Sequence, residues 1–256
     1  MIKPKILYNN ALRGITPTFS GTTVSGKGPE NATDWQDFSF FTADTGTLDY
    51  TVGADTDIDA IAIYVATTAG TNSIELQYES APATFTSLKT FSTPSGTLDI
   101  EEFTGVTVLS GRIIRIIITA TTTMNIRQIV VGEVMEAEIG QFASMTYPTL
   151  LGGIKASNAI SQNGSILSRS IKRIERTGNL ELDYLTASWV RSTWEPFAAH
   201  AARYPFIYQP DPTNRPTEVA FAVASGGIEA PKNMGKGDRM SIQMKLNMLV
   251  ADSLAI

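Results

Sequence analysis

The chain has 256 residues, of which 43% are hydrophobic and 18% charged, and it carries a net charge of −5 with no cysteine and one histidine. This composition supports a packed core and excludes wholesale disorder, disulfides, thiolate metal sites and sites that need two histidines. No run approaches the roughly 18 apolar residues of a membrane helix, and the start of the chain lacks the apolar stretch of a signal peptide. We therefore expect neither membrane insertion nor secretion.

The charge is unevenly spread along the chain. Residues 1–140 hold 8 basic and 16 acidic residues, whereas residues 141–256 hold 12 and 9. Threonine is also concentrated early, with 26 in residues 1–150 and 5 in residues 151–256. We interpret the change near residue 140 as a domain boundary. The acidic first part argues against nucleic-acid readout, because phosphate binding needs clustered Lys and Arg.

The first part has the pattern of a β-sandwich. Runs rich in Thr, Val, Ile and Tyr alternate between polar and apolar residues and are separated by turn sequences. The run 112–118 is apolar on both faces, which indicates a central strand. No helical period occurs before residue 135, so we expect an antiparallel sandwich or barrel. Strands are predicted over residues 46–52, 58–66, 73–79, 84–91, 106–109, 112–119 and 126–134.

Several segments of this part follow one another in a characteristic order. Pro29–Trp35 (PENATDW) is followed by Gly46–Tyr50 and Ile58–Val65, and the part closes with Ile126–Val134 (IRQIVVGEV). This order resembles the discoidin-type, galactose-binding-like jelly rolls. The resemblance covers about residues 1–135 and implies a jelly-roll domain over residues 1–136.

Many members of that family bind sugars, and many others are purely structural. The resemblance transfers no ligand residues, so the ligand-binding residues stay unknown. Trp35 and Tyr50 could stack on a sugar ring, although Trp35 equally suits a core position in the sandwich.

The second part begins with a stretch poor in charge and ends in strands. Residues 139–154 contain Tyr-Pro and Gly-Gly, and we assign residues 137–158 to a linker or extended arm. Asn163-Gly164 predicts a hairpin turn. Residues 240–248 alternate strictly, with Met, Ile and Leu on one face, and form the predicted last strand.

A helix is predicted between these strands, over about residues 187–203. Thr186 or Ser188 suits its N-cap. Pro196 lies inside the span, so we expect a kink or a later start. Residues 159–256 thus form an α+β domain of antiparallel sheet with one helix.

The plan of Ser161–Val250, hairpin, strand, helix, strand and strand, resembles the ring-forming tail proteins of long-tailed phages. The resemblance includes Gln162–Ser165, Tyr204–Ile207 and Gly237–Ser241. It implies a homo-oligomeric ring and other tail proteins, namely tube, hub and tape measure, as partners. The sandwich comes first here, whereas the ring part usually precedes the sandwich in distal tail proteins.

Three motifs resemble functional sites without completing them. Gly21–Gly28 nearly spells a P-loop, but Gly28 stands where the magnesium-binding Ser or Thr is required. Asp55–Asp59 has the spacing of a calcium loop without its Gly and Glu, so we interpret it as a solvated turn, with a jelly-roll calcium site as the alternative. His200 has no compelling Ser or Asp partner in the sequence.

Acidic residues could in principle supply paired carboxylates for glycoside hydrolysis. An acidic surface is the simpler interpretation. The residues concerned are Glu101, Glu102, Glu133, Glu136 and Glu138.

We therefore predict a mainly β, non-enzymatic protein with no catalytic, cofactor-binding or metal-binding residues. The leading hypothesis is a structural component of a phage tail tip or baseplate, made in the host cytoplasm and located in the virion tail. The alternative is a carbohydrate-binding module that recognises a host or environmental glycan. A carboxylate-only hydrolase is the third hypothesis.

Overall fold

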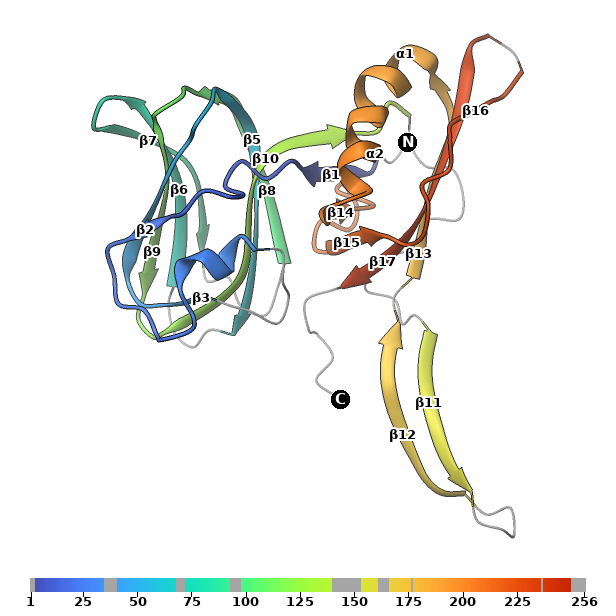
Figure 1. Ribbon diagram of the computed structural model, residues 1–256, viewed down its shortest axis with the longest axis horizontal. Coiled ribbons are helices and arrows are strands. Elements are labelled where there is room, and N and C mark those ends of the chain that lie inside the picture. The colour runs from blue at the N-terminus through green and yellow to red at the C-terminus, as the bar shows by residue number, and fades with distance from the viewer. Residues whose placement is uncertain are drawn as a thin grey trace. The chain divides into compact units, whose positions relative to one another are not determined.

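The computed structural model describes residues 3–34, 41–67, 72–92, 98–139, 153–160, 166–175, 177–235 and 237–249. The fold is mainly β, with antiparallel strand pairs and one helical segment (Figure 1). Contacts within the chain divide it into two compact units. The sandwich unit is Ile6–Met135, and the second unit is Met1–Lys5 together with Glu136–Val250.

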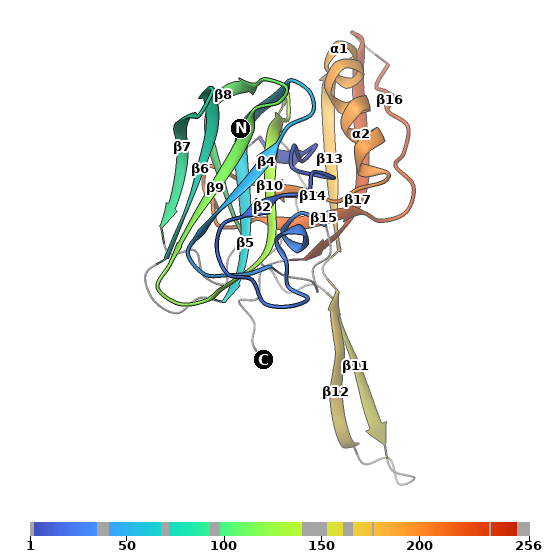
Figure 2. The same cartoon turned by 60° about the vertical axis from the view of Figure 1, so that its left-hand side comes forward.

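The sandwich unit consists of two antiparallel sheets packed face to face (Figure 2). The first sheet has the strand order β2-β4-β9-β6-β7, and the second contains β10-β5-β8, with β3 and β1 also beside β10. The first sheet consists of β2 (Thr18–Phe19), β4 (Gly46–Thr51), β9 (Ile113–Ala120), β6 (Asn72–Ala81) and β7 (Thr84–Ser92). The second consists of β1 (Lys5–Tyr8), β3 (Phe41–Ala43), β5 (Thr56–Thr67), β8 (Leu98–Val108) and β10 (Met124–Glu136), and a short 3₁₀ helix spans Pro29–Ala32.

The core lies between the two sheets and follows from the alternation in the sequence. Leu48 of β4 and Ile114 and Ile116 of β9 are fully buried, and they pack against Ile63 and Val131 of the opposite sheet in one apolar cluster. Because successive side chains of a strand point to opposite faces, the residues between them point to solvent. The mainly β, sandwich-forming prediction is confirmed, and β9 is the predicted central strand, flanked by β4 and β6.

One strand is longer than the sequence pattern predicts. The predicted strand over residues 106–109 corresponds to only the last three residues of β8, which spans Leu98–Val108. Asp99, Glu101 and Glu102 interrupt the apolar pattern there, because β8 lies at the edge of its sheet, where charged side chains are favourable.

The second unit contains a sheet with the order β13-β17-β15-β14 and a separate two-stranded hairpin. The hairpin strands, β11 and β12, pair from Gly153 with Glu175 to Ile160 with Ile166. The strands are β11 (Gly153–Ile160), β12 (Ile166–Glu175), β13 (Thr177–Thr186), β14 (Phe206–Gln209), β15 (Ala220–Ala224), β16 (Lys232–Asn233) and β17 (Arg239–Leu249), and β16 also pairs with β17.

The helical segment comprises α1 (Ala187–Trp189), the π-helical turn η2 (Val190–Trp194) and α2 (Glu195–Ala201). Thr186 is the N-cap, as predicted, since its hydroxyl accepts a hydrogen bond from the Trp189 N–H at 3.2 Å. The π turn ends at Trp194, two residues before Pro196, which has no N–H to continue the helical ladder. Phe197 packs edge-on against Phe206 of β14, with ring centroids 5.0 Å apart, so the helix covers the sheet.

The predicted arm over residues 137–158 requires correction. Residues 153–158 belong to strand β11, and residues 140–152 lie outside the described residues. The predicted turn Asn163-Gly164 also lies outside them, although the antiparallel strands on either side are those of a hairpin. Within the described part of the chain, no helix is long and apolar enough to cross a membrane.

Candidate functional site

The solvent-facing side of the five-stranded sheet, called the outer face below, carries a polar row. The strand register places one polar side chain of each strand beside the next, in the order β2, β4, β9, β6 and β7. The row consists of Thr18, Asp49, Arg115, Gln77 and Ser87. The sheet thus presents hydroxyl, carboxylate, guanidinium and amide groups side by side, which together donate and accept hydrogen bonds.

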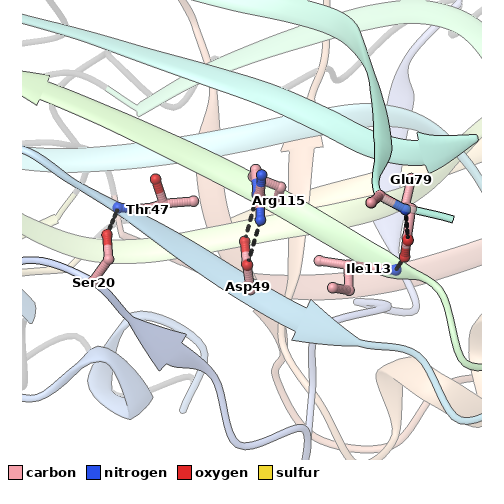
Figure 3. A network of polar contacts seen from close by, with 7 residues as sticks. Ser20, Thr47, Asp49, Glu79, Ile113 and Arg115 are labelled. Carbon is pink, nitrogen blue, oxygen red and sulfur yellow. Dashed lines mark hydrogen bonds and ion pairs between the residues drawn. The ribbon is translucent and has the colours of Figure 1, made fainter.

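Asp49 and Arg115 form the centre of this row (Figure 3). The Arg115 Nε and Nη2 atoms donate to the two Asp49 carboxylate oxygens, both at 2.7 Å. Hydrogen bonding to Asp49 raises the pKa of Arg115, and the nearby charge of Glu79 adds to this effect. The bidentate geometry fixes the guanidinium plane. Two of the five N–H groups of Arg115 are used in this way, which leaves three for another acceptor.

A phenylalanine supports the same guanidinium from another strand. The Arg115 Cζ atom lies 3.5 Å from the centroid of the Phe85 ring, a stacking contact between cation and aromatic face. Phe85 lies on β7, two strands away from Arg115 in the sheet. Arg115 is therefore held at its edge by Asp49 and on its face by Phe85, so it loses little freedom when a ligand binds.

Glu79 fixes the turn that carries Phe85. Its carboxylate accepts a hydrogen bond from the Ile113 N–H at 3.2 Å (Figure 3). It accepts another from the Ala83 N–H at 2.7 Å. Ala83 has a φ of 57°, which is unusual for a residue with a side chain. Glu79 thus joins the β6–β7 turn to β9 and positions the aromatic support of Arg115.

An open hollow of about 320 Å³ lies beside the Asp49–Arg115 pair. Its walls are Thr18, Phe19, Ser20, Thr47, Asp49 and Arg115. The Ser20 hydroxyl accepts a hydrogen bond from the Thr47 N–H at 2.9 Å, which holds β2 against β4. Within the described residues the Thr18 and Thr47 hydroxyls have no hydrogen-bond partner, so both can bind a polar ligand.

Close packing beneath the hollow keeps its floor in place. The Phe19 ring lies against Gly46 and Gly21, where an added Cβ would stand 2.6 and 2.5 Å from ring carbons. The same ring packs edge-on against Phe41 at 5.0 Å. Only glycine fits at these two positions, and the floor is consequently rigid.

Of the two aromatic residues suggested as sugar platforms, Tyr50 does not belong to the site. Tyr50 is fully buried in the core, so its prediction as a stacking residue is wrong. Burial raises the pKa of Tyr50, and its hydroxyl has no hydrogen-bond partner within the described residues. Trp35 lies outside the described residues.

The carboxylates of Asp55, Asp57 and Asp59 accept hydrogen bonds from the protein itself, and Asp57 and Asp59 lie on strand β5, which begins at Thr56. Asp55 accepts from the Ser110 N–H and Asp59 from the Val134 N–H, both at 2.8 Å. Asp57 accepts from the Thr107 hydroxyl. Among the described residues, no group of three His, Cys, Asp or Glu side chains could hold a metal ion.

The other suggested residues are spread over the fold. His200 lies on α2, where its ring contacts that of Tyr204. Glu101 pairs with Lys89, Glu136 pairs with Lys3, and Glu138 binds Thr186. Glu102 lies on β8. The P-loop-like Gly21–Gly28 forms a turn closed by a Lys27 N–H to Val24 hydrogen bond.

Glu133 is near two other carboxylates. Its pKa is raised by partial desolvation and by the charges of Asp57 and Asp59. Glu133 is exposed, and Asp57 and Asp59 already accept hydrogen bonds, so these groups do not reproduce the paired acid and base of a hydrolase.

Sequence reasoning missed the Asp49–Arg115 site. One feature of the sequence could have indicated it: a single Arg inside an otherwise apolar strand, Ile113-Ile114-Arg115-Ile116-Ile117-Ile118. A charge at that position must lie on the solvent-facing side of the strand and needs a partner across the sheet. Its partner could be named only once the register of β4 against β9 was known.

No protein-family model matches the chain, and no curated protein matches it. Solved structures do match. Chitosan-binding module 1 of a chitosanase/glucanase from Paenibacillus sp. IK-5 is 18% identical, with a TM-score of 0.42, over 49% of this chain and 100% of that one. Module 2 of the same enzyme, in complex with chitotriose, is 16% identical with a TM-score of 0.39, over 48% and 100%. A pectin-binding carbohydrate-binding module is 17% identical with a TM-score of 0.39, over 49% and 92%.

These three structures are carbohydrate-binding modules, and none of them is a phage tail protein. The predicted membership of the phage tail-tip or baseplate class is therefore wrong, and the ring and tail-protein partners that followed from it have no support.

Proposed function

We propose that the protein binds carbohydrate, and that the outer face of the sandwich unit, centred on Asp49 and Arg115, is the binding site. We further propose that the sandwich unit is a jelly roll and that it acts by binding, without catalysis. One observation carries the proposal: Arg115, held by Asp49 and stacked on Phe85, presents its remaining N–H groups beside an open, hydroxyl-lined hollow.

The chemistry of the hollow suits a sugar. A sugar hydroxyl both donates and accepts, so neighbouring hydroxyls can donate to Asp49 and accept from Arg115 at the same time. The Thr18 and Thr47 hydroxyls extend the same pattern along the hollow. A site so open on one side admits part of a long polymer more readily than it encloses a small molecule, which supports a polysaccharide as the ligand.

Affinity electrophoresis of the full chain tests this function. The protein is run in native gels that contain chitosan, pectin or a neutral galactan, chosen to span positive, negative and zero charge. We expect at least one polysaccharide to retard the wild-type protein. We expect Arg115→Ala to lower the affinity about tenfold or more, because a hydrogen bond to a charged group contributes about 1.5–3 kcal/mol.

Arg127→Ala is the matched control. Arg127 also lies near an aromatic ring, 5.2 Å from the centroid of Tyr64, but on β10 of the opposite sheet. This variant should bind as the wild type does. Unchanged mobility of the wild type in every gel contradicts carbohydrate binding, whereas retardation that Arg115→Ala leaves intact contradicts only the assignment to the outer face. Because we propose binding without catalysis, prolonged incubation of these polysaccharides with the protein should leave their chain length unchanged.

A further inference from the structure

A tyrosine with unusual backbone geometry stands out on the second unit. Tyr184 has a φ of 60°, in the left-handed region that bulky residues rarely occupy. Its side chain is not hidden, since the residue is 55% exposed. Strain of this kind persists only where the surrounding structure enforces it, and it gathers at functional positions.

A β-bulge displays this tyrosine. Leu182 of β13 pairs with Ile242 of β17, and Leu185 pairs with Met240, so two residues, Asp183 and Tyr184, face one residue of β17. Both leucines point into the core. The bulge therefore turns the extra side chain towards solvent.

Two contacts hold the bulge in this conformation. The Tyr184 N–H donates to the Met234 Sδ atom at 3.4 Å, and the Tyr184 carbonyl accepts from Arg239 Nη1 at 3.0 Å. Sulfur is a weak acceptor, so the first contact compensates little for the strained backbone. A glycine would adopt the same φ without strain.

A polar hollow lies on the same face of the sheet. It measures about 160 Å³, and its polar walls include Glu181, Ser241, Gln243 and the ion pair of Lys232 with Glu229, whose Nζ and Oε2 atoms are 2.7 Å apart. Ser241 is the β17 residue that faces the bulge, and it pairs with Lys232 of β16. The register thus places the tyrosine one row from a hollow that offers carboxylate, ammonium, hydroxyl and amide groups.

We infer that Tyr184 and this hollow form a second saccharide subsite on the second unit, with the tyrosine ring as the stacking surface for a pyranose. An aromatic face beside planar and hydroxylic hydrogen-bonding groups provides both parts of sugar recognition: apolar contact with the C–H groups of the ring and hydrogen bonds to its hydroxyls. The inference rests on the proposed carbohydrate-binding function and adds a site that is chemically independent of Arg115.

Equilibrium dialysis of the full chain with chitotriose, trigalacturonic acid and galactotriose tests the subsite. The variants are Tyr184→Gly, Tyr184→Phe, Arg115→Ala and the double variant Arg115→Ala/Tyr184→Gly. For the trisaccharide that binds, we expect two molecules per wild-type chain and one for each of Tyr184→Gly and Arg115→Ala. The double variant should bind none, and Tyr184→Phe should retain both sites because it keeps the ring.

Thermal unfolding of the same proteins excludes misfolding as the cause. Tyr184→Gly should have a melting temperature equal to or above that of the wild type, because the strain is relieved. Leu109→Ala is the control, because it removes a similarly exposed apolar side chain, 52% exposed, on the sandwich unit. It should change neither the number of trisaccharide molecules bound nor the melting temperature.

The outcomes separate the two proposals. Equal trisaccharide binding by the wild type and Tyr184→Gly overturns the subsite and leaves the site at Arg115 standing. The absence of any binding by the wild type overturns both. A melting temperature that falls sharply in Tyr184→Gly shows that the ring has a structural role and also overturns the subsite.

Discussion

Thr186 and Glu138 hold each other at the start of the helix. The Glu138 carboxylate accepts from the Thr186 N–H at 2.7 Å and from its hydroxyl at 2.8 Å, while that hydroxyl oxygen also accepts from the Trp189 N–H. Thr186→Ala should lower the free energy of unfolding by about 1–2 kcal/mol, because the N-cap is lost. Urea unfolding measures this change. Thr186→Ser keeps a hydroxyl at the N-cap and should retain most of the wild-type free energy of unfolding. Ser188→Ala, an exposed change in the same helix, should have almost no effect on it.

Gly46 should not tolerate a methyl group. An added Cβ would stand 2.6 Å from Phe19 ring carbons and 2.9 Å from the Gly21 Cα. Gly46→Ala should therefore destabilise the protein by about 1–3 kcal/mol through overpacking. Gly53→Ala is the control, since nothing lies within 4 Å of its added Cβ. Equal stability of the two variants would show that the Phe19 ring can move aside, and the floor of the hollow would then not be rigid.

Asp49 and Arg115 should be energetically coupled. Their side chains are 23% and 26% exposed, and the two bonds between them are bidentate, so we expect a coupling free energy of about 1 kcal/mol. A double-mutant cycle of Asp49→Asn and Arg115→Gln, followed by urea unfolding, measures it. The value should fall in 1 M salt, where exposed charges are screened. A cycle in which the two changes simply add would show that Phe85 alone positions the guanidinium.

Glu133 should make stability depend on pH in a defined direction. Its pKa is raised in the folded protein by desolvation, then by Asp57 and Asp59, so the folded state binds the proton more tightly than the unfolded chain does. The resulting stabilisation is complete below the ordinary carboxyl pKa of 4.5 and is lost as the pH rises through the raised value. Glu133→Gln should therefore unfold at a higher temperature than the wild type at pH 7, and the difference should shrink towards pH 4. A difference that grows on acidification would contradict this account.

Local alternation was enough to predict most of the sandwich. Buried apolar residues such as Leu48 and Ile116 occupy every second position of their strands, because each strand buries one face. This alternation can be recognised from the sequence alone. Thr186 was likewise predicted as an N-cap, because its role depends on three neighbouring residues. Features determined by a few consecutive residues are visible before the fold is known.

The candidate site depends on pairings that no local pattern contains. Arg115 meets Asp49 across one strand boundary and Phe85 across two, and Arg115 and Asp49 are 66 positions apart in the sequence. The sequence allows Tyr50 as a residue that could stack on a sugar, because an alternating strand shows which residues share a face but not which face is buried. The phage-tail hypothesis failed for a broader reason: an order of strands and helix does not determine function, which resides in particular side chains.

The two ends of the sandwich unit emerge next to each other. Ile6 lies on β1 and Met135 on β10, and these strands are neighbours in one sheet. Residues on the far side of both ends, Pro4 and Ala137, are joined by a 3.1 Å backbone hydrogen bond within the second unit. The chain therefore enters the sandwich unit at Ile6 and leaves it at Met135 through neighbouring strands, and two cuts, one at each of these junctions, should release the sandwich for exchange or transplantation.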